Sequence, residues 1–213
     1  MTLETTIEKA RMDKLRFRSL DGRDVAPAEW LRMWSSLYRG YDEAEYRSLI
    51  AAHETFSAAD FERIGRWKDN AGADGRWKPN VAMVAYKIWV QASLEMPRCP
   101  DQNHIAEFLL DWSERKYRNE YKSSVVQERC FGLSSATTIL HFISGGRYPI
   151  FDSRVRRAAS RVLDSPVANT VQWYLDSYCP LVSRVAIECG VTDVRSVDRA
   201  LFCYGARRLP CSK

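Results

Sequence analysis

A glycine turn leading into a short helix is predicted by Cys130-Phe131-Gly132-Leu133-Ser134-Ser135-Ala136-Thr137-Thr138-Ile139-Leu140-His141-Phe142. After a second turn the chain continues as Tyr148-Pro149-Ile150-Phe151-Asp152-Ser153-Arg154-Val155-Arg156-Arg157, in which Asp152 stands where a new helix should begin. Backbone amides at a helix N-terminus can hold a phosphate, because the helix dipole favours negative charge there. Together with a carboxylate and arginines further along, this combination indicates chemistry beside a nucleic-acid backbone.

These two stretches resemble the helix-hairpin-helix DNA glycosylases. Gly132-Leu133-Ser134-Ser135-Ala136-Thr137-Thr138 is similar to the family's hairpin, and Ile150-Phe151-Asp152-Ser153-Arg154-Val155-Arg156-Arg157 is similar to the run with its catalytic aspartate. The sequence departs from the pattern at the second hairpin glycine, which is Ser134, and at the lysine of lyase-competent members, which is Ala136. The resemblance implies an all-α fold of two helical lobes, with a helix-hairpin-helix motif and an active-site cleft between the lobes.

The resemblance also implies how the chain is divided. Residues 1–213 would form a single glycosylase unit. One lobe would take residues about 20–147, with the hairpin at about 121–143, and the other would take residues 1–19 and 148–213.

Local patterns independently predict helices along most of the chain. Apolar spacing and capping residues place them at about 4–18, 28–38, 42–54, 61–68, 81–94, 103–116, 121–130, 135–143, 152–163, 169–188 and 194–204. Alternation with a period of two is not sustained, so we expect at most a minor strand pair.

Composition favours a soluble DNA-binding protein. A net charge of +5 and a pI near 8.9 favour anionic partners. The six cysteines form no CxxC pair and no apolar signal segment leads the chain, which indicates a reduced cytoplasmic location, in a bacterial-type cytosol or nucleoid. We expect a monomer that binds double-stranded DNA, with no membrane partner, no cofactor and no metal site, since the histidines lack partners at ligand spacing.

The expected chemistry begins with extrusion of a nucleotide from the duplex, because a stacked base hides its glycosidic bond. Asp152 would stabilise the oxocarbenium character that develops at the sugar and would orient the attacking water. Since Ala136 offers no amine, the resemblance implies a monofunctional glycosylase that leaves an abasic site. The remaining candidate DNA-contacting residues are Gly132, Ser134, Ser135, Ala136, Thr137, Arg154, Arg156 and Arg157.

A pocket for the flipped base is predicted less directly. Two segments in which a tryptophan stands between cations, Arg66-Trp67-Lys68 and Arg76-Trp77-Lys78, flank a glycine-containing loop, and such interleaving suits base stacking beside phosphates. The alternative is that both tryptophans are packing groups. His141, among apolar neighbours, is interpreted as an interior histidine.

Other interpretations of the same residues stay open. Asp152 would cap a helix in any helical protein, and the arginines after it would suit an ordinary solvated face. The chain would then be a non-catalytic helix-hairpin-helix DNA-binding protein, or a helical protein–protein scaffold in which both motifs are accidental.

The substrate within the glycosylase hypothesis is a modified or damaged base. A relative this divergent suggests a less common one, such as glucosylated hydroxymethylcytosine in phage DNA. That substrate would make the protein an antiphage defence enzyme rather than a DNA repair enzyme.

Overall fold

The computed structural model describes residues 15–39, 42–52, 57–68, 102–114, 116–119, 127–130 and 132–207. These residues are predominantly helical, with one two-stranded antiparallel pair, and they belong to two compact units. Unit 1 contains the chain up to Tyr38 and from Pro149 onward, and unit 2 contains Arg39 to Tyr148. No helix in the described ranges is both long and apolar enough to span a membrane.

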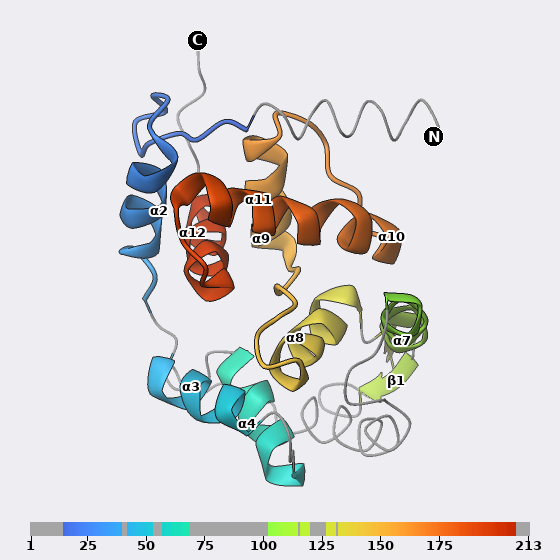
Figure 1. The fold of residues 1–213 in the computed structure, drawn as a ribbon. Coiled ribbons are helices and arrows are strands. Elements are labelled where there is room, and N and C mark those ends of the chain that lie inside the picture. Colours follow the sequence, from blue (N-terminus) through green and yellow to red (C-terminus); the bar gives the residue numbers. More distant parts are fainter. Residues whose placement is uncertain are drawn as a thin grey trace. The chain divides into compact units, whose positions relative to one another are not determined.

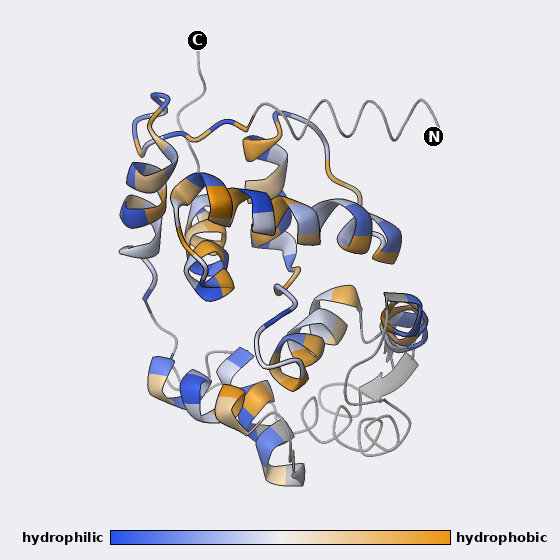
Figure 2. Cartoon of the chain, viewed as in Figure 1, coloured by the Kyte–Doolittle hydropathy of each residue, from blue (hydrophilic) through white to orange (hydrophobic). Residues whose placement is uncertain are grey.

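Unit 1 is a helical assembly (Figure 1). Its elements are α2 (Pro27–Ser35), α9 (Ser153–Val162), α10 (Val171–Trp173), the π-helical segment η1 (Tyr174–Tyr178), α11 (Cys179–Cys189) and α12 (Val194–Ala206). Helix α12 packs against α2, α9 and α11. Hydrophilic and hydrophobic residues occur side by side on these helices in Figure 2, as expected for helices with one buried face.

Local signals set the ends of these helices. Pro27 occupies the first turn of α2, where its missing amide costs no hydrogen bond. The carboxylates of Asp152 and Asp193 cap α9 and α12, and each accepts from two backbone amides. The Thr170 hydroxyl caps α10 by accepting from the Trp173 amide. Gly190 ends α11 in the left-handed conformation that glycine adopts at little cost.

An aromatic core joins α2 to α12. Trp30, Trp34 and Tyr204 have no exposed surface, and both tryptophan rings meet the Tyr204 ring edge-on, at centroid distances of 5.5 and 5.0 Å. Aromatic pairs of this geometry stabilise a core beyond their buried area alone. This contact explains why α2 belongs with the C-terminal helices.

Helices α9 and α12 cross at a glycine. A β-carbon added to Gly205 would lie 1.8 Å from the Arg154 carbonyl oxygen, a distance that no side chain can occupy. Two arginines of α9 strengthen the crossing, since Arg157 Nε donates to the Gly205 carbonyl at 3.0 Å and Arg161 donates to the Tyr204 carbonyl. These cations satisfy carbonyls in the last turn of α12, where the helix dipole is negative.

The described residues of unit 2 form helices and one strand pair (Figure 1). Its elements are α3 (Glu43–Ala51), α4 (Ala58–Lys68), α7 (Gln102–Glu114), β1 (Lys116–Asn119), β2 (Gln127–Cys130) and α8 (Leu133–Ile143). The strands are antiparallel, and Lys116 pairs with Cys130 at the end nearer the helices. Among the described helices of this unit, α8 packs against both α7 and α3.

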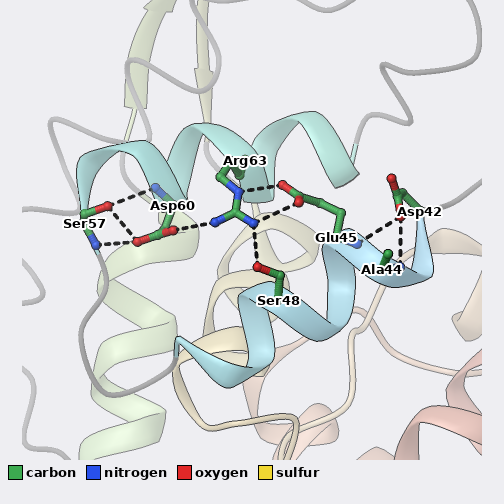
Figure 3. Close-up of polar contacts among 7 residues, drawn as sticks. All are labelled: Asp42, Ala44, Glu45, Ser48, Ser57, Asp60 and Arg63. Carbon is green, nitrogen blue, oxygen red and sulfur yellow. Dashed lines mark hydrogen bonds and ion pairs between the residues drawn. The ribbon is translucent and has the colours of Figure 1, made fainter.

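An arginine connects α3 to α4 (Figure 3). Arg63 makes two hydrogen bonds to the Glu45 carboxylate, at 2.7 and 2.9 Å, and further bonds to Asp60 and Ser48. The paired charges raise the pKa of the Arg63 guanidinium above its ordinary value, and the hydrogen bond to Glu45 is the largest cause. Asp60 also closes the start of α4, by accepting from the Ser57 amide and hydroxyl.

The all-helical expectation holds at the level of class, but the predicted first helix of the hairpin is wrong. Residues 127–130 form strand β2 instead of the end of a helix over 121–130. Strand β2 therefore precedes α8 in the chain, and the described helices that α8 packs against are α7 and α3. The Gly132 amide donates to the Ser113 carbonyl at 3.1 Å, which joins the turn to the last residues of α7.

The predicted lobe boundary also differs from the units. The predicted division places residues 20–38 in the lobe with the hairpin, whereas α2 packs on α12 in unit 1. The chain returns from unit 2 to unit 1 between Tyr148 and Pro149, one residue from the predicted lobe boundary. The helix predicted at 81–94 and most of the one at 4–18 lie outside the described residues, and residues 15–18 are not helical.

Candidate active site

The turn before α8 has a conformation that only glycine adopts readily. Gly132 has φ 79° and ψ 151°, although a β-carbon there would meet no atom within 4 Å. The requirement for glycine therefore comes from the backbone and not from crowding. Because Gly132 is also the N-cap, no side chain caps the first amides of α8.

The side chains of this turn divide into two groups. Ala136 and Thr137 are fully buried in unit 2, whereas Ser134 and Ser135 are partly exposed. The hydroxyls of Thr137 and Thr138 donate back to the Ser134 carbonyl, so they are occupied within the helix. Any contact between this turn and a phosphate would therefore be made by backbone amides and the two serines.

Asp152 lies in unit 1 as the N-cap of α9. Its Oδ1 atom accepts from the Arg154 amide at 2.8 Å and from the Val155 amide at 3.0 Å. The residue is partly exposed, while Phe151 before it and Val155 after it are buried. The carboxylate is thus held in a fixed orientation at the positive end of a helix.

The arginines of α9 have different environments. Arg157 is bonded to Gly205, as described above, and the Arg154 guanidinium lies 4.5 Å from the centroid of the Phe202 ring. Arg156 is partly exposed. Burial lowers the pKa of Arg161, the arginine one turn further along. Arg157 and Arg161 therefore have clear structural roles, which the sequence did not distinguish from phosphate contacts.

The predicted base pocket is not assembled in the described residues. Trp67 is buried in unit 2, edge-on to Phe142 at a centroid distance of 5.2 Å and beside Tyr46 at 5.6 Å. The Trp67 ring is therefore a core group, as the alternative interpretation predicts, and the assignment of Trp67 to a base pocket is corrected. Lys68, the last residue of α4, is partly exposed, and Trp77 and Lys78 lie outside the described residues.

His141 is an interior histidine, as predicted. It is fully buried, with Nδ1 2.6 Å from the Tyr148 carbonyl oxygen and Nε2 2.9 Å from the Tyr46 hydroxyl. A carbonyl only accepts, so Nδ1 carries a proton and donates. These bonds connect α8 to the turn that follows it and to α3.

An aromatic cluster that the sequence does not predict surrounds Phe151, the residue before Asp152. The Phe151 ring lies 4.8 Å from the Tyr178 ring and 5.6 Å from the Trp173 ring, which it stacks on, and Tyr174 is also in contact. Trp173 is partly exposed, and the other three rings are buried. The aromatic spacing after Thr170 was visible in the sequence, but its proximity to Asp152 depends on the fold.

Two cysteine thiols of α11 are held in surroundings that burial makes less polar than water. Burial raises the pKa of Cys179 to about 12 and that of Cys189 to about 11, so both thiols stay protonated and unreactive near neutral pH. In the parts of the chain that the structure describes, no group of three or more histidine, cysteine, aspartate or glutamate side chains could hold a metal ion.

Comparisons with protein-family models, with curated proteins and with solved structures find no match.

Proposed function

We propose that the protein is a monofunctional DNA glycosylase that hydrolyses the bond between a flipped, modified base and its sugar. The observation that carries the proposal is the Asp152 carboxylate, which two backbone amides fix at the N-terminus of α9. A fixed anion of this kind can stabilise positive charge as it develops on the sugar, without reorganising during the reaction. It can also orient the water molecule that attacks C1′.

The turn before α8 supports the same proposal. The glycine conformation at Gly132 and the lack of a side-chain cap leave the first turn of α8 suited to a phosphate oxygen. Contacts of this type hold any DNA sequence alike, because they involve the backbone and not the bases. Recognition of the base would then depend on the extruded nucleotide.

A non-catalytic DNA-binding protein is the alternative. It is favoured by Asp42, whose Oδ1 accepts from the Ala44 and Glu45 amides, both at 2.9 Å, in the same pattern as Asp152. Capping alone is thus enough to explain an aspartate before α9. The alternative predicts DNA binding without base release.

A substrate panel tests the proposal. Duplexes that carry single oxidised, alkylated, mismatched or hypermodified bases, and phage DNA with and without glucosylated hydroxymethylcytosine, are incubated with the protein and analysed for free base. We expect release from at least one modified substrate and none from unmodified DNA. Release only from unmodified DNA, or binding without release across the panel, would contradict the proposal.

A further inference from the structure

The chain that leads into Asp152 is a buried segment without regular structure. Pro149, Ile150 and Phe151 are all buried, and they connect the end of unit 2 to the start of α9. Carbonyl groups in such a segment need hydrogen-bond partners, because they have lost water and have no helix or sheet to pair with. The source of those partners determines how firmly Asp152 is held.

Two tyrosines of η1 supply the partners. The Tyr174 hydroxyl donates to the Pro149 carbonyl at 2.9 Å, and the Tyr178 hydroxyl donates to the Ile150 carbonyl at 3.3 Å. Neither side chain has any exposed surface. Burial raises the pKa of Tyr178 well above its ordinary value, and the charges of Asp198 and Asp152 raise it further, so this hydroxyl keeps its proton and remains a donor.

The helical geometry brings both hydroxyls to one segment. The Cys179 amide bonds to the Tyr174 carbonyl, five residues back, which defines a π-helical turn between α10 and α11. Such turns are rare, and they occur frequently at functional sites. Here the turn contains both tyrosines that donate to the segment before Asp152.

We infer that Tyr174 and Tyr178 are positioning residues for Asp152. Their hydroxyls fix the Pro149 and Ile150 carbonyls, and the Phe151 ring packs on Tyr178, so the backbone enters α9 with the Asp152 carboxylate aligned on its two amides. For its catalytic consequence this inference rests on the proposed function. The structural consequence, stronger hydrogen bonding between Asp152 and the first amides of α9, does not rest on the proposed function.

The test compares Tyr174→Phe and Tyr178→Phe with Tyr204→Phe. Each change removes a hydroxyl from a buried ring, but the Tyr204 hydroxyl has no hydrogen-bond partner among the described residues, so its loss serves as the matched control. Amide hydrogen exchange is followed at Arg154 and Val155, which Asp152 caps. The Arg195 and Ser196 amides, which Asp193 caps, provide the internal reference.

We expect exchange at Arg154 and Val155 to accelerate about threefold to tenfold in Tyr174→Phe and Tyr178→Phe, the range for loss of one buried hydrogen bond. Exchange at Arg195 and Ser196 should not change, and Tyr204→Phe should resemble the wild type. With a substrate duplex, the single-turnover rate of base release should fall by a similar factor while DNA affinity is kept. A purely structural defect would instead lower both.

Different results would contradict the positioning role of the tyrosines and the glycosylase proposal. If exchange at the Asp152 cap is unchanged in both tyrosine variants, the positioning role is wrong, whatever the activity. If exchange accelerates but the wild-type protein releases no base from any duplex, the tyrosines do hold the Asp152 cap and the glycosylase proposal is wrong. Accelerated exchange with undiminished base release would show that catalysis does not depend on this alignment.

Discussion

At the scale of single residues, Gly205 sets how closely α9 and α12 can approach. We expect Gly205→Ala to destabilise the protein by about 3 kcal/mol or more, because the new methyl group would overlap a backbone carbonyl that cannot move aside. Denaturant unfolding measures this. Gly190→Ala is the control, because a β-carbon at Gly190 would meet open space. Its only cost is the strain of alanine in the left-handed conformation, about 1 kcal/mol of unfolding free energy. Equal costs for the two changes would show that the helices do not cross as described.

Ala136 determines how the proposed glycosylase reaction would end. Its side chain is fully buried and has no amine, and the sequence has no lysine between Lys122 and Lys213. A Schiff base with the sugar needs an amine nucleophile, so we expect borohydride to trap no covalent protein–DNA adduct. Strand breaks should appear only after hot alkali. A trapped adduct that is lost when Lys68, Lys78 or Lys122 is mutated would overturn the water mechanism.

At the scale of elements, the turn into α8 should depend on Gly132 and not on the side chain of Ser134. A β-branched residue is strained at φ 79° by about 1–3 kcal/mol, so Gly132→Val should distort the turn. We expect this variant to bind all DNA sequences more weakly, whereas Ser134→Ala should bind almost normally. Fluorescence anisotropy on unrelated duplexes tests both. Unchanged affinity in folded Gly132→Val would rule out the turn as a phosphate contact.

The contact between α3 and α4 should depend on Arg63. Replacing it with Gln leaves two carboxylates without their cation and should cost about 1–2 kcal/mol. Arg184→Gln is the control, because that exposed pair within α11 is expected to contribute less than about 0.5 kcal/mol. Thermal unfolding of the two variants decides this, and a larger loss for Arg184→Gln would contradict the assignment.

Acid should weaken the same network. Burial alone would raise the pKa of Asp60, but hydrogen bonds from Ser57 and Arg63 outweigh it and lower the pKa below the usual 3.8. A lowered carboxyl pKa stabilises the folded state above pH 3.8 and loses that contribution as the pH falls through the folded value. The difference between wild type and Arg63→Gln should therefore shrink in this acid range.

Helices were predictable where their signals are local. Helices α9 and α12 fall close to the expected ranges 152–163 and 194–204. The single helix expected at 169–188 is divided among α10, η1 and α11, because a π-helical turn interrupts it. Strand β2 was mistaken for a helix because its conformation comes from pairing with β1, which no local pattern reveals. The positions of Asp152 and Gly132 were predictable for the same reason as the helices.

At the scale of the whole molecule, several residues have positions that depend on packing between distant parts of the chain, which local sequence patterns do not predict. Trp30 and Trp34 belong to unit 1 because their rings meet Tyr204, far along the chain. Trp67 packs in the core against Phe142, although the cations beside it in the sequence suggest a base pocket. The tyrosines that hold the segment before Asp152 were missed for the same reason, since their bonds join residues more than twenty positions apart.

In the proposed function Asp152 is a catalytic residue and not only a helix cap. Single-turnover base release by Asp152→Asn, with Asp42→Asn as control, distinguishes these two roles. Asn is itself a good cap, so both variants should fold, and each replaces a carboxylate that accepts from two amides. We predict that Asp152→Asn loses base release at least about a hundredfold while it keeps DNA affinity, and that Asp42→Asn matches the wild type. Base release by Asp152→Asn at the wild-type rate would show that Asp152 is not catalytic.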